Sequence, residues 1–330
     1  MLSELDLIRR IREQVLPGDS CLRKGIGDDC AAFVPRDGAT MTLVTTDTLV
    51  EGVHFDLAWH PPELLGRKAL AVNVSDVAAM GGVSRYALLS LAVPSGVEPE
   101  RLDAFMQGFL GGLARYQMTL IGGDTVKSDQ GWVLSITVLG EVDQGQVVYR
   151  SGARSGDQVW VSGPLGQAAA GLELCRRGLH TAPATPAELV KAHLDPLPET
   201  ALGPMLAASG LVSAMIDLSD GLASDLAHIC EESGVAAEVA AEALPISEAT
   251  RQVARECDLD AVRLAIAGGE DYRLLFTAPP SATKGIQALA HHAVGGQLFR
   301  VGEIVEGQGV CLVDKGQSAL IDFQGYDHFR

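Results

Sequence analysis

The chain alternates between segments of helical and of strand periodicity along its whole length. Apolar side chains three and four residues apart predict helices at 4–15, 61–72, 77–82, 99–116, 165–177, 186–209, 248–257 and 281–292. A further helix is expected after Gly221, with Gly234 as its stop. Short apolar or alternating runs predict strands at 41–46, 132–139, 158–162, 214–216, 272–277, 298–304 and 310–313, and a further short strand is expected to end at residues 122–125. This mixture of elements predicts an α+β fold.

A polar stretch rich in glycine and serine, residues 147–157, interrupts the pattern. We therefore expect two domains, residues 1–150 and 151–330, because 330 residues with 47% hydrophobic content can bury a large core. No apolar run approaches the roughly 20 residues that span a bilayer, and residues 1–4 lead into an acidic amphipathic helix. We expect a cytoplasmic protein with no membrane partner.

Charge and cysteine usage exclude several function classes. The formal net charge of −17 argues against nucleic-acid binding, which needs a basic surface. The six cysteines show no CxxC spacing, so neither a zinc site nor a disulfide framework is indicated, and most are expected to be small buried hydrophobes. A chain this acidic must neutralise any phosphate ester that it binds, and metal ions are the simplest means.

Six short acidic motifs follow or precede predicted elements, each with glycine or a hydroxyl beside the acid. They are Gly25-Ile26-Gly27-Asp28-Asp29, Thr45-Thr46-Asp47, Asn73-Val74-Ser75-Asp76, Gly122-Gly123-Asp124-Thr125, Asp217-Leu218-Ser219-Asp220-Gly221 and Gly268-Gly269-Glu270-Asp271. Converging carboxylates stay ionised only beside cations, because like charges about 4 Å apart repel by roughly 4 kcal/mol. Alone, each motif also fits a solvated turn, whereas their recurrence favours a Mg²⁺ site.

Several separated aspartates suit several Mg²⁺ ions along a polyphosphate, since Mg²⁺ is usually held by one or two carboxylates together with phosphates. The candidate ligands are Asp29, Asp47, Asp76, Asp124, Asp217 and Asp220, with hydroxyls from Thr45, Thr46 and Ser219. Asp28 ranks below Asp29, because neighbouring side chains on an extended segment point to opposite faces. Arg150 could clamp a terminal phosphate. A P-loop, the protein-kinase motifs and GxGxxG are all absent, so a nucleotide would bind by another architecture.

In chain order, these motifs together resemble the thiamine-monophosphate kinase family. The matching segments are Gly25–Ala31, Thr46–Phe55, Asn73–Gly81, Ile121–Thr125, Ile216–Leu222, Gly268–Tyr272 and Gly325-Tyr326-Asp327-His328-Phe329. The resemblance implies ATP-dependent phosphorylation of thiamine monophosphate to thiamine diphosphate by direct in-line transfer. It also implies the two-domain fold of aminoimidazole-ribonucleotide synthetase, with a homodimer whose N-terminal sheets join into a β-barrel near the site. The N-terminal domain would carry the ATP and Mg²⁺ loops and the dimer interface, and the C-terminal domain would complete the site.

The resemblance also implies roles for individual residues. As Mg²⁺ ligands it implies Asp29, Thr45, Thr46, Asp47, Asp76, Asp124, Asp217 and Asp220. For ATP it implies Gly123, Asp124, Arg150 and Ser219, and for the acceptor it implies His54, Glu270 and Tyr326. Among these, we take the catalytic residues to be Asp47, Asp124 and Asp220. A carboxylate and an aromatic face suit the thiazolium cation and aminopyrimidine of the acceptor.

Alternatives remain at the level of residues and of function. His54 also fits a structural histidine whose ring nitrogens are hydrogen-bonded beside a strand, and Tyr326 also fits a residue that only packs the C-terminus. Glu270 also fits a cap of the turn before strand 272–277, although Asp271 fits that cap better. Arg273 stands where the family often has Glu, which leaves the rim of the acceptor pocket open. The competing functions are another ATP-dependent member of the same superfamily, a non-catalytic MgATP-binding protein and a metal-dependent phosphatase.

Overall fold

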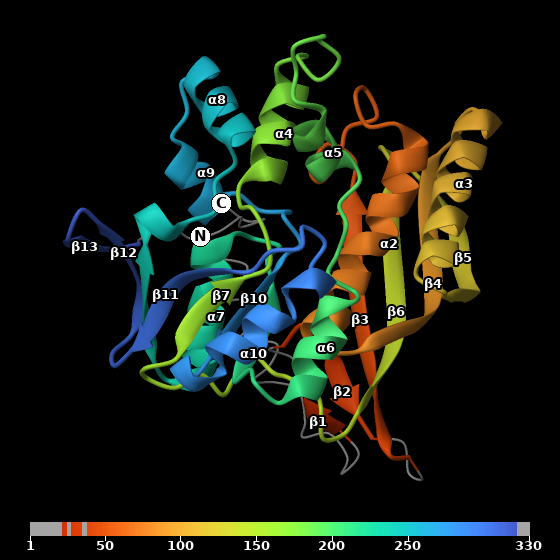
Figure 1. Cartoon of the computed structure of the whole chain (residues 1–330). Helices are drawn as coiled ribbons and strands as arrows, with labels where there is room; N and C mark the ends of the chain where they lie inside the picture. The colour runs from red at the N-terminus through yellow and green to blue at the C-terminus, as the bar shows by residue number, and fades with distance from the viewer. Residues whose placement is uncertain (1–21, 25–27, 35–37, 322–330) are drawn as a thin grey trace.

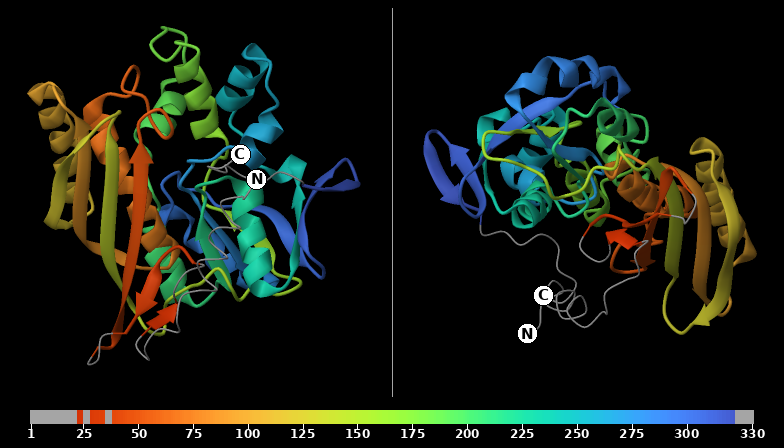
Figure 2. Two further views of the ribbon diagram at one scale, coloured as in Figure 1. Left: turned by 180° about the vertical axis from the view of Figure 1, so that it is seen from behind. Right: turned by 90° about the horizontal axis from the view of Figure 1, so that it is seen from below.

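The computed structural model describes residues 22–24, 28–34 and 38–321 (Figure 1). The helix expected at 4–15 and the acceptor residue Tyr326 lie outside the described residues. No described helix has the length and apolarity needed to cross a membrane. The described chain forms two α+β halves, which lie side by side when viewed from below (Figure 2).

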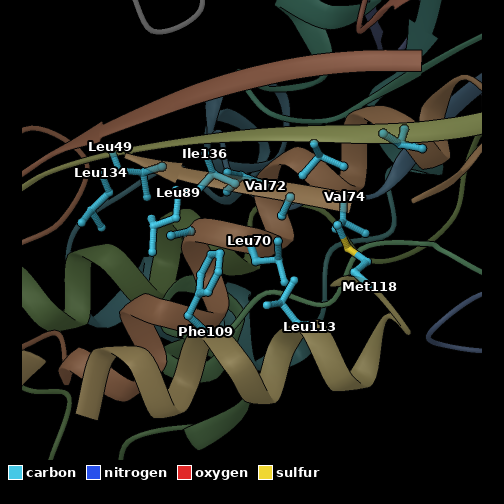
Figure 3. Packing of buried hydrophobic residues seen from close by; sticks show 14 of the residues in the cluster. Leu49, Leu70, Val72, Val74, Leu89, Phe109, Leu113, Met118, Leu134 and Ile136 are labelled. Carbon is cyan, nitrogen blue, oxygen red and sulfur yellow. The ribbon is translucent and has the colours of Figure 1, made fainter. Parts of the chain in front are cut away.

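The N-terminal half is a six-stranded mixed sheet with two helices on one face. In sheet order its strands are β1 Leu22–Lys24, β2 Ala31–Phe33, β3 Thr40–Val50, β6 Val133–Asp143, β4 Val83–Pro94 and β5 Thr119–Ser128. Neighbouring strands are antiparallel except β4 and β5, which run parallel. The two helices are α2 Pro62–Ala79 and α3 Pro99–Arg115, and Figure 3 shows their apolar side chains packed under the sheet.

Helices α2 and α3 approach closely because glycines face each other across the contact. A Cβ atom at Gly108 would lie 1.8 Å from the carbonyl oxygen of Glu63, and one at Gly66 would lie 2.2 Å from that of Phe105. Helix α2 also contacts the C-terminal elements β8, α5 and α6. It is therefore covered on most sides, which explains why polar residues such as Lys68 and Asn73 on this helix are fully buried.

The C-terminal half is a seven-stranded mixed sheet covered on both faces. In sheet order its strands are β13 Gln317–Leu320, β12 Gly309–Asp314, β9 Ala236–Ala240, β11 Phe299–Val305, β7 Gln158–Val161, β10 Leu274–Ala278 and β8 Ala214–Asp217. Helix α7, Leu222–Ser233, packs on one face, while α6, Leu202–Ser209, and α10, Thr283–Ala288, pack on the other. Strands β7 and β10, and the edge strand β8, are accordingly buried at every position.

Four helices of this half cluster at the end of the molecule nearest the start of α2 (Figure 1). They are α4 Gln167–Arg176, α5 Ala187–Leu194, α8 Glu248–Glu256 and α9 Ala261–Ala267. The start of α4 is capped by Asp271, whose carboxylate accepts the backbone N–H groups of Gly166 at 2.6 Å and Ala168 at 3.1 Å. Asp271 thus caps a helix distant in sequence, not the turn before β10.

Several sequence-based expectations were wrong in extent. Helix α2 runs unbroken to Ala79, so Asp76 lies inside a helix and does not precede a short one. Strand β5 continues to Ser128, which places Asp124 in mid-strand. Segment 28–30 is a bend, so the alternation argument used to rank Asp28 below Asp29 does not apply there. The missed elements are β1, β2, β4, β9, β13 and α9.

Candidate functional site

A pocket of about 770 Å³ opens between the two halves, and both halves line it. Its acidic lining residues are Asp47, Asp56, Asp76, Glu173, Asp217, Asp220 and Glu270. The remaining wall includes aromatic and small apolar side chains, among them Phe55, Trp59 and Ala168. The pocket therefore combines a strongly anionic region with surfaces suited to an organic ring.

Three carboxylates from distant segments converge beside this pocket. Oxygen atoms of Asp29, Asp76 and Asp217 all lie within 4.8 Å of one another. Asp29 comes from the bend before β2, Asp76 from the last turn of α2 and Asp217 from the end of β8. Thr45 on β3 donates its hydroxyl to Asp76 Oδ2 at 2.5 Å. Motifs separated by up to 188 residues thus form one cluster.

Asp47 and Asp220 extend the cluster into the pocket. Asp47 is placed by Asn73 of α2, whose Oδ1 accepts the backbone N–H of Asp47 at 2.9 Å. Burial raises the pKa of Asp47 to about 6, with contributions from the charges of Asp220 and Asp29. Asp225 supports the loop that carries Asp220, because its Oδ2 accepts the backbone N–H groups of Asp220 and Gly221 at 3.2 and 3.1 Å.

The electrostatics of the cluster fit bound divalent cations. Burial raises the pKa of Asp76 and of Asp217 well above 3.8, and neighbouring aspartates raise both further. Asp217 Oδ2 is buried and has no hydrogen-bond partner among the described residues. An orphaned buried oxygen within a group of repelling carboxylates is the donor set that Mg²⁺ requires, so the residues present fit that ion.

Arg150 approaches the cluster from the segment that joins the two sheets. It contacts Asp29 through two guanidinium nitrogens, Nη2 to Oδ1 at 2.8 Å and Nε to Oδ2 at 3.3 Å. Asp28 Oδ2 lies 3.2 Å from Lys24 Nζ and also accepts the backbone N–H of Arg150 at 3.4 Å. Asp29 is thus the member of this pair that joins Asp76 and Asp217.

Three predicted residues lie apart from the cluster within one chain. The strand pairing places Gly123 on β5 in register with Asp47 on β3, with β6 and β4 between them. At about 4.8 Å between neighbouring strands, the two backbones lie about 14 Å apart. Asp124 is likewise in register with Thr48. Thr46 alternates to the face opposite Asp47 and is exposed there, as is Asp124. A single chain therefore does not bring Thr46, Gly123 or Asp124 to the acidic cluster.

Two predicted acceptor residues line the pocket. His54 follows β3, and its Nδ1 accepts the backbone N–H of Val50 at 3.0 Å. Glu270 contacts Lys68 Nζ at 2.8 Å and His193 Nδ1 at 2.9 Å. Although burial raises the pKa of Glu270, Lys68 and His193 lower it further than burial raises it, so Glu270 is ionised. Arg273 pairs with buried Glu199 at 3.2 Å and is not part of the pocket wall.

Sequence reasoning missed the residues that support the site. Asn73 and Asp225 carried no assigned role, and Lys68, His193 and Trp59 were not singled out. One signal was available: Lys68 lies between Leu65 and Ala69 on the face of α2 that is apolar in the sequence, where an unpaired lysine is costly. Its partners could not be found, because they lie on other elements.

Comparisons with known proteins agree with this architecture. The model of the AIR synthase related protein N-terminal domain matches residues 27–142, and the model of the corresponding C-terminal domain matches residues 154–315. A thiamine-monophosphate kinase of Escherichia coli (strain K12) is 39% identical over 329 residues, covering 99% of this chain and 98% of that relative. One of Bacillus subtilis (strain 168) is 34% identical over 333 residues, covering both chains completely. The solved structure of AaThiL complexed with AMPPCP and TMP aligns with a TM-score of 0.86 and 33% identity, covering 99% of this chain and 97% of that one.

Proposed function

This chain belongs to the thiamine-monophosphate kinase family, and we propose that it transfers the γ-phosphoryl group of ATP to thiamine monophosphate, forming thiamine diphosphate. The observation that carries the proposal is the convergence of Asp29, Asp76 and Asp217 beside a pocket that both halves line. The relative that was solved with AMPPCP and TMP supports ATP and thiamine monophosphate as the two substrates. Because the reaction consumes ATP, we also propose a cytoplasmic location.

The acidic cluster would hold Mg²⁺ through Asp29, Asp47, Asp76, Asp217 and Asp220, with the Thr45 hydroxyl beside Asp76. Bound Mg²⁺ would neutralise these carboxylates and supply positive charge to the phosphate oxygens of ATP. We propose that Arg150 and Ser219 contact the nucleotide. Arg150 is suited to this because its guanidinium is already oriented by Asp29, which leaves less side-chain entropy to lose when a phosphate binds.

The chain's own contribution to the chemistry is positioning. A phosphate monoester is ionised near neutral pH, so its oxygen can attack in line without a strong general base. Asn73 fixes the backbone of Asp47, and Asp225 fixes that of Asp220, so two pocket-lining carboxylates stay in place. Holding donor and acceptor in the reactive geometry is one of the main ways in which a protein accelerates phosphoryl transfer.

The acceptor would occupy the part of the pocket lined by His54, Trp59 and Glu270. An ionised carboxylate and an indole face both suit the thiazolium and aminopyrimidine rings. We propose the same role for Tyr326, which lies outside the described residues, as the family resemblance implies. We also retain the domain division near residue 150, which falls between strands β6 and β7.

We further propose a homodimer in which the N-terminal sheets join through β5 into a barrel. Within the described chain β5 is an edge strand, and its Ile121 and Val126 side chains are 53% and 51% exposed. Exposed apolar edge strands are strong candidates for pairing with a second copy. Gly123 and Asp124 lie on this strand, so in such a dimer these residues of one subunit would approach the acidic cluster of the other subunit.

An acceptor screen tests the proposed function. Purified protein is incubated with MgATP and, separately, thiamine monophosphate, unphosphorylated thiamine or no acceptor, and ADP is measured. We expect ADP and thiamine diphosphate only with thiamine monophosphate. Absence of thiamine diphosphate refutes the assignment. If calorimetry then shows MgATP binding without turnover, the protein is a non-catalytic MgATP-binding protein. If phosphate is released in the absence of ATP, the protein is a phosphatase.

A further inference from the structure

Glu270 has its two carboxylate oxygens engaged by two different elements. Lys68 of α2 contacts Oε1 at 2.8 Å, and His193 of α5 contacts Oε2 at 2.9 Å. Lys68 is 0% exposed and His193 is 1% exposed, whereas the Glu270 side chain is 26% exposed and lines the pocket. The two partners therefore lie behind the carboxylate, and its open edge faces the space where the acceptor would bind.

The backbone of Glu270 is fixed as firmly as its side chain. Its φ of 68° lies in the left-handed region, which a non-glycine residue adopts only where the surroundings require it. Its N–H donates to the carbonyl oxygen of Ser219 at 2.7 Å. Next to it, a Cβ at Gly269 would lie 2.4 Å from the same carbonyl oxygen, so only glycine permits this close approach. Glu270 is thus positioned against the loop that carries Asp220.

The chemistry that this carboxylate selects follows from its partners. The pKa of His193 is lowered, chiefly by burial and by Lys68, so its imidazole is neutral, and its Nδ1 lies 2.9 Å from Glu270 Oε2. Lys68 and His193 take one acceptor position on each oxygen, and an ionised carboxylate has about four. The remaining positions accept hydrogen bonds but cannot donate one. Trp59, whose ring centroid lies 5.5 Å from that of His193, provides an aromatic wall beside them.

We propose that Lys68 and His193 are positioning residues that hold Glu270 as a fixed hydrogen-bond acceptor, and that Glu270 thereby selects acceptors whose heteroaromatic ring presents an N–H donor. The proposal rests on the function proposed above, since the 4′-amino group of the aminopyrimidine is such a donor. A lysine that only stabilised the fold would pair with a carboxylate away from the pocket, as Arg273 does with Glu199. Here the paired carboxylate lines the pocket.

The test compares thiamine monophosphate with its 4′-deamino analogue, in which hydrogen replaces the amino group and the ring carries no N–H donor. The wild-type protein, Lys68→Met, Glu270→Gln and the double variant are assayed at saturating MgATP, with Lys284→Met as an exposed-lysine control. We expect the wild-type protein to prefer thiamine monophosphate by about 100-fold or more in kcat/KM. Lys68→Met should reduce this preference about 10-fold, mainly through KM for the acceptor, with KM for MgATP unchanged.

The double variant separates positioning from folding. It removes both charges of the buried pair, so no unpaired charge is left to destabilise the fold, and thermal unfolding checks each protein. If Lys68 acts through Glu270, the double variant should keep the same preference in kcat/KM for thiamine monophosphate over the analogue as Glu270→Gln. An unchanged preference in Lys68→Met, or losses that multiply in the double variant, overturns the proposal. If the wild-type protein does not phosphorylate thiamine monophosphate, the proposed function fails separately, and calorimetric binding of the two ring compounds still tests the selection.

Discussion

At the scale of single residues, Asp47 gives the most direct test of the acidic cluster. It lines the pocket, and its backbone is fixed by Asn73, so Asp47→Asn changes charge with little change in shape. We expect kcat to fall on the order of 100-fold or more, because positive charge would no longer be held where the transition state needs it. Steady-state ADP formation measures the effect. Asp258→Asn, on the turn after α8, is the matched control, and unchanged turnover in Asp47→Asn would remove this residue from the mechanism.

The raised pKa of Asp47 predicts how stability depends on pH when no metal is present. Burial and neighbouring carboxylates move this pKa from 3.8 to about 6. Between those values the folded chain keeps a proton that the unfolded chain has released, so the stabilisation is complete below about pH 4 and is lost as pH rises through 6. Asp28, raised to about 6 chiefly by burial, acts in the same direction.

Buried histidines with a lowered pKa, such as His60, act in the opposite direction, so the contribution of Asp47 is isolated by comparison with Asp47→Asn. Calorimetry in chelator should show the Tm of the wild-type protein, relative to that of Asp47→Asn, falling by roughly 5 °C between pH 4.5 and pH 7. Added Mg²⁺ should raise Tm at pH 7 and have little effect at pH 4.5, where protons occupy the carboxylates. A metal-free difference in Tm between the two proteins that is flat or rising over this interval contradicts the prediction.

The residue scale also shows what the sequence could and could not predict. Asp29, Asp76 and Asp217 were predicted as one group because each acid carries a local signature of glycine or hydroxyl neighbours. Lys68 and His193 carry no such signature, since their role comes from a contact with Glu270 on a third element. Pairing between distant elements is set by tertiary packing, which periodicity does not report.

At the scale of elements, the contact between α2 and α3 predicts opposite effects for two glycines on one helix. A Cβ at Gly108 would overlap the backbone of Glu63, whereas one at Gly111 would meet nothing within 4 Å. Gly108→Ala should destabilise the fold by about 1–3 kcal/mol through overpacking. Gly111→Ala should stabilise it by about 0.5–1 kcal/mol, because alanine loses less backbone entropy in a helix. Denaturant unfolding measures both, and equal effects would contradict this packing.

Elements were predicted best where residues that start or stop an element, such as glycine, lie at both ends. The helix after Gly221 stops at Gly234, whose φ of 69° gives the left-handed cap that glycine favours. By contrast, the prediction ended α2 too early, at Val72. Apolar residues lie on all sides of this helix, so the helical spacing of apolar and polar positions is weak. Strand β4, Val83–Pro94, begins after Gly82 and was missed, although Gly81 and Gly82 mark a break after the helix.

At the scale of the whole molecule, the two halves were predicted, and their placement across one pocket was not. The polar junction near residue 150 is visible in the sequence, but the sequence gives no direct measure of which loops meet across it. The meeting of Asp47 and Asp76 from one half with Asp217 and Asp220 from the other depends on α2 packing against β8. The position of Gly123 and Asp124 also requires the sheet order, which places β5 at an edge.

The last prediction concerns subunit cooperation. Because Asp124 lies on an exposed edge strand, three strands from β3, we expect it to complete the site of the partner subunit. Asp124→Asn and Asp217→Asn should then each be inactive alone as dimers. When equal amounts are unfolded together and refolded, about half of the dimers are mixed, and each mixed dimer has one intact site, so about a quarter of wild-type turnover should return. If Asp124 instead serves its own subunit, both sites of a mixed dimer are damaged and no turnover returns.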